Sequence, residues 1–192
     1  MAGQFGCLDL QRLPRAERET VPAELNSPIT YEQTVLRLIT ALPVAATPPA
    51  GEVSAEDYGA RWLLVSNCLD RLAVGEGDVP VAPQPGDLLI PLRLLEYRQK
   101  DQRIQVRTNG KGNFETLIEG VADFTLSFGV AAEPQSAAMV GTYQDVIGAA
   151  QAARIRSVRV ALLLSDKPGA KTQEGVQRQR YVQVVSVRNR LD

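Results

Sequence analysis

The chain has 192 residues, of which 44% are hydrophobic and 22% charged, with a formal net charge of −1 and a sequence pI of about 5.6. This length and composition predict one globular domain over residues 1–192 with a sizeable core. The acidic pI disfavours nucleic-acid binding, which usually needs a clearly basic face. The absence of histidine removes the commonest general base and metal ligand.

The first 30 residues carry Pro14, Pro22 and Pro28 among charged side chains and show little periodicity. Proline fixes φ and removes a backbone donor, so such a segment does not extend a regular element. We therefore expect residues 1–30 to form an irregular lead-in with room for one short helix.

Residues 31–42 have the spacing of an amphipathic helix. Thr30 is a candidate N-cap with Gln33 three residues later, and the apolar residues at helical spacing are Val35, Leu38, Ile39 and Leu42. Pro43 would end this helix, and the Pro- and Ala-rich residues 43–56 are typical of an exposed connection.

From residue 61 to residue 192 the pattern changes mainly to antiparallel strands. RWLLVSNC at 61–68 is a short apolar run that predicts a buried strand, and the Pro- and Gly-rich residues 75–87 predict a loop. Further strands are expected at 88–99, 103–110, 113–120 and 122–130, with chain reversals at Lys100-Asp101 and Asn109-Gly110.

Two of these strands alternate in polarity. In RIQVRT, Ile104 and Val106 face one way, while Arg103, Gln105 and Arg107 face the other. The segment ADFTLSFGV repeats the alternation through Phe124, Leu126 and Phe128. This pattern indicates an antiparallel sheet with one solvated face.

The C-terminal part of the chain ends in two long strands. Residues 143–154 indicate a weak helix or an irregular excursion, and strands are expected at 155–166 and 180–190 around a polar loop. Arginines alternate with apolar residues in these strands, at positions 154, 156, 159, 178, 180, 188 and 190. The pattern favours a solvated strand face, and the alternative is a basic face that contacts an acidic partner.

No motif in the sequence predicts catalysis. The Gly-rich residues 75–78 and 109–113 lack the strand-to-helix context of a phosphate loop, so both are interpreted as turns. The acidic residues Asp70, Glu76 and Asp78 miss the spacing of an EF-hand and are interpreted as a solvated loop. The serines at 66 and 165 have neither a GxSxG elbow nor a histidine.

We therefore expect no enzyme and no catalytic, cofactor-binding or metal-binding residues. The aromatic residues Tyr58, Trp62, Tyr97 and Tyr181 are interpreted mostly as core or half-buried sheet positions rather than as a stacking platform.

The two cysteines, Cys7 and Cys68, form neither a CxxC motif nor a zinc-ligand pattern. Their spacing leaves two alternatives open, a disulfide or two buried thiols, because two cysteines in a chain of this length do not fix the redox compartment.

Five blocks of the sequence resemble, in this order, a PilW-type minor pilin of bacterial type IV pili. They are MAGQFGC at 1–7, RWLLVSNC at 61–68, LIEGVADFTLSFGV at 117–130, IRSVRVALLLSD at 155–166 and RYVQVVSVRNRL at 180–191. The prepilin signature and the long apolar helix that follows it in the family are absent here. We interpret Met1 as an internal methionine at the head of a soluble fragment.

The resemblance implies an α+β fold, the pilin-like head, in which an antiparallel β-sheet packs against a helix and the N-terminal transmembrane spine helix is missing. It also implies export to the periplasm, an oxidising compartment, and hence a disulfide between Cys7 and Cys68.

The function that the resemblance implies is a structural minor pilin in initiation and assembly of the pilus. The implied partners are other minor pilins and the major pilin in a tip subcomplex, together with a tip adhesin and the inner-membrane assembly platform. The alternatives are a minor pseudopilin of type II secretion and a DNA-uptake pilin whose arginine-bearing strands bind phosphate.

Overall fold

A computed structural model describes residues 21–26, 29–32, 34–43, 51–67, 71–132, 142–147, 151, 154–170 and 174–186. Cys7 and Cys68 lie outside these residues, so their pairing stays a prediction. Most of the described chain is strand. The elements are η3 (Ala23–Asn26), β1 (Ile29–Glu32), β2 (Val35–Ala41), η4 (Glu56–Tyr58), β3 (Trp62–Ser66), β4 (Leu72–Glu76), β5 (Leu88–Lys100), β6 (Arg103–Thr108), β7 (Glu115–Glu119), β8 (Val121–Val130), β9 (Tyr143–Gln144), β10 (Ile155–Ser165) and β11 (Arg178–Ser186).

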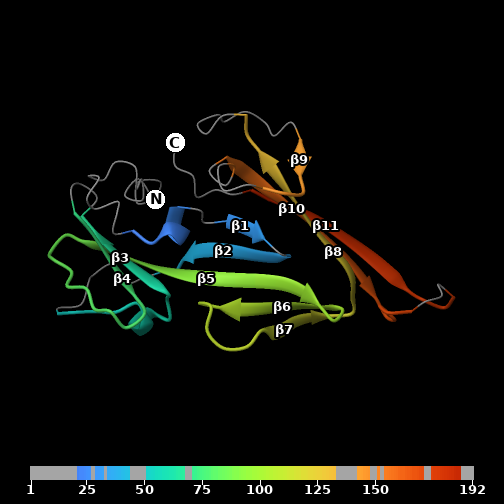
Figure 1. Cartoon of the computed structure of the whole chain (residues 1–192), viewed down its shortest axis with the longest axis horizontal. Coiled ribbons are helices and arrows are strands. Elements are labelled where there is room, and N and C mark those ends of the chain that lie inside the picture. Colours follow the sequence, from blue (N-terminus) through green and yellow to red (C-terminus); the bar gives the residue numbers. More distant parts are fainter. Residues whose placement is uncertain are drawn as a thin grey trace.

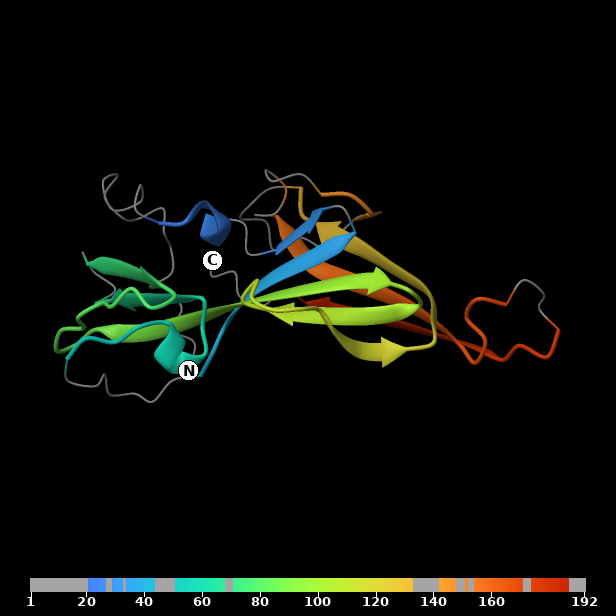
Figure 2. The same cartoon turned by 60° about the horizontal axis from the view of Figure 1, so that its bottom comes forward.

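The described strands form two antiparallel sheets (Figure 1). The larger sheet is organised around β5, which pairs with β2 along one edge and with β3 and then β6 along the other. Strands β1, β4 and β7 extend this sheet from β2, β3 and β6. The smaller sheet has the order β11-β10-β8-β9. Its β10–β11 hairpin, orange to red in Figure 2, projects beyond the larger sheet.

The predicted α+β fold is wrong. The described residues contain strands and two short 3-10 helices, η3 and η4, and no α-helix among them packs against either sheet. The second layer that covers the β1–β2–β5 region is instead the smaller sheet (Figure 1).

The helix expected at residues 31–42 is a β-hairpin made of β1 and β2. Its apolar residues satisfy a period of two as well as the helical period. Ile29 and Leu36 are buried on the side that meets the smaller sheet, where Tyr31 and Leu38 are partly buried. The β-branched Ile29, Thr30, Val35, Ile39 and Thr40 lose less conformational freedom in a strand than in a helix.

Three apolar clusters form the described core. One lies between the sheets and joins Ile29 and Leu36 to Leu126, Phe128 and Val158. The Tyr31 and Phe128 rings contribute to it, with centroids 6.0 Å apart. Because the sheets meet face to face through these side chains, burial of this cluster holds the two layers together.

The other two clusters lie on opposite faces of β3. Trp62 and Leu64 pack with Val21 and Leu25 beside η3, whereas Leu63 and Val65 pack with Val53 and Ala55. Residues 44–50 of the exposed connection expected at 43–56 lie outside the described residues. The burial of Val53 and Ala55 corrects that expectation for residues 51–56. Small residues let this segment lie close to the sheet.

Several strand predictions are confirmed. Strand β3 is buried along its whole length, β6 buries Ile104, and β8 buries Leu126 and Phe128. The reversals after Lys100 and at Asn109-Gly110 are also confirmed, with positive φ at Asp101, Asn109 and Gly110. None of the helices within the described ranges has the length and apolar character needed to cross a membrane.

Candidate functional site

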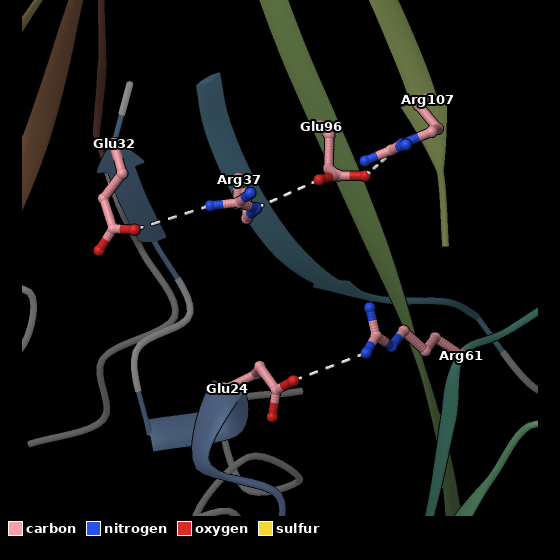
Figure 3. Close-up of polar contacts among 6 residues, drawn as sticks. All are labelled: Glu24, Glu32, Arg37, Arg61, Glu96 and Arg107. Atoms are coloured by element: carbon pink, nitrogen blue, oxygen red, sulfur yellow. Dashed lines mark hydrogen bonds and ion pairs between the residues drawn. The ribbon is translucent and has the colours of Figure 1, made fainter. Parts of the chain in front are cut away.

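A row of three charged side chains crosses the larger sheet (Figure 3). It lies on the face away from the smaller sheet, because the neighbouring Leu36, Leu38 and Tyr97 pack against the smaller sheet. Glu96 of β5 lies directly opposite Arg37 of β2 and Arg107 of β6. Arg37 Nε donates to Glu96 Oε1 at 3.2 Å, and Arg107 Nε donates to Glu96 Oε2 at 2.6 Å. We call Arg37, Glu96 and Arg107 the charged ladder.

The carboxylate at the centre of the ladder is nearly inaccessible. The Glu96 side chain is 3% exposed, whereas those of Arg37 and Arg107 are 40% and 29% exposed. Burial acts to raise the pKa of Glu96, but the hydrogen bonds and charges of Arg107 and Arg37 together outweigh it and hold this pKa below its ordinary value. Glu96 is therefore ionised at neutral pH.

The arginines of the ladder make further contacts at its two ends. Arg37 Nη1 lies 3.9 Å from Glu32 Oε2. The Arg107 guanidinium lies over the Phe114 ring, 4.5 Å from its centroid, and Arg98 lies 3.8 Å from the same centroid. Such cation–π contacts fix the position of an arginine without neutralising its charge.

A second arginine centre lies beside the ladder. Arg61 Nη2 is 3.6 Å from Glu24 Oε1 (Figure 3). Arg61 Nε also donates to Glu76 Oε1 at 3.2 Å. Its guanidinium also stacks over Trp62, 4.5 Å from the ring centroid. Arg61 thus links η3, at Glu24, to β4, at Glu76.

Asn109 positions the ladder along β5. It sits where β3 and β6 meet end to end on the same edge of β5. The Asn109 side chain accepts from Leu94 N at 3.1 Å and donates to Gly59 O at 3.0 Å, and its backbone N donates to Leu94 O at 2.7 Å. Its φ of 56° is one that asparagine tolerates.

A groove of about 470 Å³ opens between the ladder and Arg61. Besides these arginines it is lined by Glu24, Glu32 and Glu96 and by the apolar Ile39 and Leu94. The groove is lined by three arginines and three glutamates, so its charges are paired and its formal net charge is zero. A base at neutral pH needs a pKa near 7, and the lowered pKa of Glu96 removes it from that role.

A further buried carboxylate stabilises a loop. The Asp87 side chain, 2% exposed, forms an ion pair with Arg71 and accepts from Gln84 N at 2.7 Å. Arg71 also donates to Ala82 O at 2.8 Å. These contacts hold the loop between β4 and β5. The described part of the chain contains no group of three acidic, histidine or cysteine residues placed to hold a metal ion.

Strand β11 differs from the rest of the described sheets because all nine of its residues are exposed. Its exposed large hydrophobic residues are Tyr181 (48%), Val182 (55%), Val184 (50%) and Val185 (50%). In the register with β10, Val182 lies opposite Ala161 and Val184 opposite Arg159. Apolar side chains therefore lie on both faces of this edge strand.

The C-terminal part of the sequence, which includes β10 and β11, is basic, while the remainder of the chain is acidic. Residues 154–192 contain nine basic and three acidic side chains, a formal charge of +6, whereas residues 1–153 contain twelve and nineteen, a charge of −7. On β10, the Arg159 guanidinium stacks over Tyr143, 3.9 Å from the ring centroid. Within the described ranges, Arg178 and Arg180 of β11 form no ion pair.

Comparison with family models matches residues 94–190 to the Type IV Pilus-assembly protein W family (PilW). The chain belongs to the PilW family. It is thus a protein of type IV pilus assembly, with a cell-envelope or pilus-related location. No curated protein and no solved structure matches the chain significantly.

The PilW match covers β11 and part of the ladder. It includes Glu96 and Arg107, whereas Arg37 and Arg61 precede it. The resemblance inferred from the five sequence blocks is therefore confirmed at the level of the family.

The residues that were weighed as candidate site residues from sequence have different surroundings in the structure. Glu76 contacts Arg61, while Asp70 lies outside the described residues. Gly77 and the residues at 109, 110 and 112 have positive φ, as expected of turns. Ser66 Oγ donates to Arg71 O at 2.8 Å, which is a structural contact. Trp62 is buried as expected, but Tyr181 is exposed.

Sequence reasoning missed the charged ladder. Its signal was a single charged residue inside an apolar strand, as in Leu36-Arg37-Leu38 and Leu95-Glu96-Tyr97. A charge at such a position needs a partner, because burying it alone is costly. Which partner it has depends on strand register, and the register is not local in sequence.

Proposed function

We propose that this PilW-family chain is a structural minor pilin without chemistry of its own, which takes part in initiation and assembly of the type IV pilus within a tip subcomplex. Its proposed partners are other minor pilins and the major pilin, with a tip adhesin and the inner-membrane assembly platform as further contacts. The proposed location is the periplasmic face of the inner membrane before assembly and the pilus tip afterwards.

The observation that carries this proposal is that the family match contains the most exposed apolar strand of the described fold. Strand β11 lies within residues 94–190, and its tyrosine and valines are about half exposed. Exposed apolar groups gathered on one element favour contact with another protein. The charged groove, in contrast, has paired charges and a carboxylate with a lowered pKa, which suits a structural role.

Deletion of the gene tests the proposal. We expect a deletion strain to lose surface pili and twitching motility, and complementation to restore both. Co-purification with the other minor pilins, compared between wild-type and deletion backgrounds, tests the tip subcomplex. Normal pili and normal secretion in the deletion strain would refute the assembly role. Loss of type II secretion with intact pili would instead favour a pseudopilin.

A DNA-uptake role is the second candidate, favoured by the charge of +6 on residues 154–192. Phosphate contacts make affinity fall steeply with salt. Duplex DNA binding at low salt that is lost on reversing the charge of Arg178 and Arg180 would support this role, and no binding at low salt would reject it.

The Cys7–Cys68 disulfide also belongs to this proposal. A bridge that closes a loop of about 60 residues would stabilise the fold by roughly 4 kcal/mol in the chain-entropy model. A thiol count under denaturing, non-reducing conditions tests it, and two free thiols would reject the bridge.

A further inference from the structure

We infer that β11 is an acceptor edge for β-strand addition, which binds an extended, acidic segment of another protein. The inference deepens the assembly role proposed above and rests on it. It concerns the backbone groups and side chains along Arg178–Ser186, and it assigns the chemistry of the partner.

Strand β11 is an edge strand of the smaller sheet. It pairs with β10 over nine positions and with no other strand of the described chain. An edge strand presents a row of backbone N–H and C=O groups to a partner strand. With nine residues, β11 is longer than the edge strands β1, β4 and β7, which have four, five and five.

Strand β11 lacks the features that usually prevent the addition of another strand to an exposed edge. Edge strands are commonly blocked by proline, lysine, bulges or inward-pointing charges. The segment from Tyr181 to Ser186 contains no proline and no charge, and the register between β10 and β11 runs without a shift. By comparison, β7 is short, carries a glutamate at each end and has a register shift against β6.

The two arginines of β11 indicate that the partner is acidic. Arg178 and Arg180 lie on the same face of β11 as Val182 and Val184, because alternate residues of a strand share a face. Neither arginine has an ion-pair partner among the described residues. An added strand that carries two acidic residues at alternate positions would place them opposite these arginines.

The order of these side chains along β11 also determines the sequence pattern that a partner strand needs. On this face, an antiparallel partner needs two apolar residues opposite Val184 and Val182, followed by two acidic residues opposite Arg180 and Arg178. Main-chain hydrogen bonds would supply affinity, and the alternating side chains would supply specificity. The acidic residues also add long-range attraction to residues 154–192, whose formal charge is +6.

A synthetic peptide tests this inference directly. The probe has valine, valine, glutamate and glutamate at alternate positions with threonine between them, and the control peptide has lysine in place of glutamate. We expect the chain to bind the acidic peptide and hydrogen exchange to slow at β11 amides. We also expect binding to weaken about tenfold in the Arg178→Glu/Arg180→Glu variant, since opposite cross-strand charges attract and like charges repel.

Matched variants separate the edge from general surface effects. Val182→Lys with Val184→Lys puts charges on the apolar part of β11, and we expect it to abolish binding. Leu117→Lys makes the same change on β7, where Leu117 is 56% exposed, and should leave binding unchanged. Lys100→Glu is the control for charge reversal. Circular dichroism melts identify any variant that does not fold, and Arg178→Gln/Arg180→Gln then replaces the reversed pair.

Several results would overturn the inference. They are equal binding of the acidic and lysine peptides or no binding of either, exchange protection away from β11, and displacement of the peptide by duplex DNA at low salt. Self-association of the chain through β11, seen by sedimentation, would also overturn it by making a second copy the occupant. Failure of this test leaves the deletion phenotype intact, so it is distinguishable from failure of the assembly role.

Discussion

The arginines of the two sheets have different surroundings. In the larger sheet, Arg37 and Arg107 both contact Glu96, and Arg61 contacts Glu24 and Glu76. On β11 of the smaller sheet, Arg178 and Arg180 make no ion pair with any described residue. Arg37, Arg61 and Arg107 are thus paired with carboxylates inside the fold, whereas the charges of Arg178 and Arg180 on β11 are exposed.

This difference distinguishes charged residues that stabilise the fold from charged residues that are exposed for contact with a partner. The ladder joins three strands, and its central carboxylate is almost fully buried, so its disruption should affect folding. The side chains of β11 are exposed, so their substitution should affect association more than folding. Substitutions on the two surfaces should therefore separate stability from partner binding.

The largest expected effect on stability is that of Glu96→Ala. Removing the carboxylate leaves Arg37 and Arg107 close together without their shared partner, so we expect the free energy of unfolding to fall by about 2 kcal/mol. Urea denaturation followed by circular dichroism measures this change. Arg180→Ala is the matched control on β11, and we expect it to change the free energy by less than about 0.5 kcal/mol. Equal losses of unfolding free energy in the two variants would contradict the proposed difference between the ladder and β11.

The pH dependence of stability tests the same carboxylate. Because the pKa of Glu96 is lower in the folded state than its ordinary value of 4.5, its contribution is fully present above that value and is lost as the pH falls through the folded-state pKa. We expect wild-type stability to decrease as the pH falls below about 4.5, and Glu96→Gln to reduce this slope. An unchanged slope in the variant would assign the acid sensitivity to other carboxylates.

The double substitution Val182→Lys/Val184→Lys tests the β11 side of the comparison. Both valines are about half exposed, so we expect the free energy of unfolding to change by less than about 1 kcal/mol. Co-purification with other pilus subunits should nevertheless be lost. A large loss of stability would mean that these valines support the fold rather than a partner.

The smallest effect is expected for Glu119→Gln. Glu119 pairs with Arg103 at 3.2 Å, but both side chains are about half exposed or more, so solvent screens the pair. We expect a change within about 0.5 kcal/mol in urea denaturation. A change as large as that of Glu96→Ala would show that burial does not decide the value of these pairs.

The strands could be predicted from sequence where local pattern decides them. The apolar run at β3 and the alternation in β6 and β8 identify these elements, because side chains of a strand alternate between faces. The β1–β2 hairpin could not be predicted in this way, because Leu38 and Ile39 fit both the helical period and the strand period. The turn before β2 also contains Thr34 at a φ of 66°, which is rare for a β-branched residue.

The site depends on contacts that local pattern does not specify. Arg37 and Glu96 are 59 positions apart and meet only because β2 pairs with β5 in one register. A shift of one residue would move each side chain to the other face. The arginines of β11 were recognised from sequence as a strand face, but only the sheet order shows that β11 is an edge strand.

Replacing the chromosomal gene with the Val182→Lys/Val184→Lys variant tests the central claim most directly, namely that β11 serves pilus assembly by binding a partner. Surface pili are counted and the level of the protein is measured in the same cells, with Leu117→Lys as the control. We expect the β11 variant to accumulate normally but to lack pili, while the Leu117→Lys control accumulates normally and forms pili. Normal piliation by the β11 variant would contradict the account.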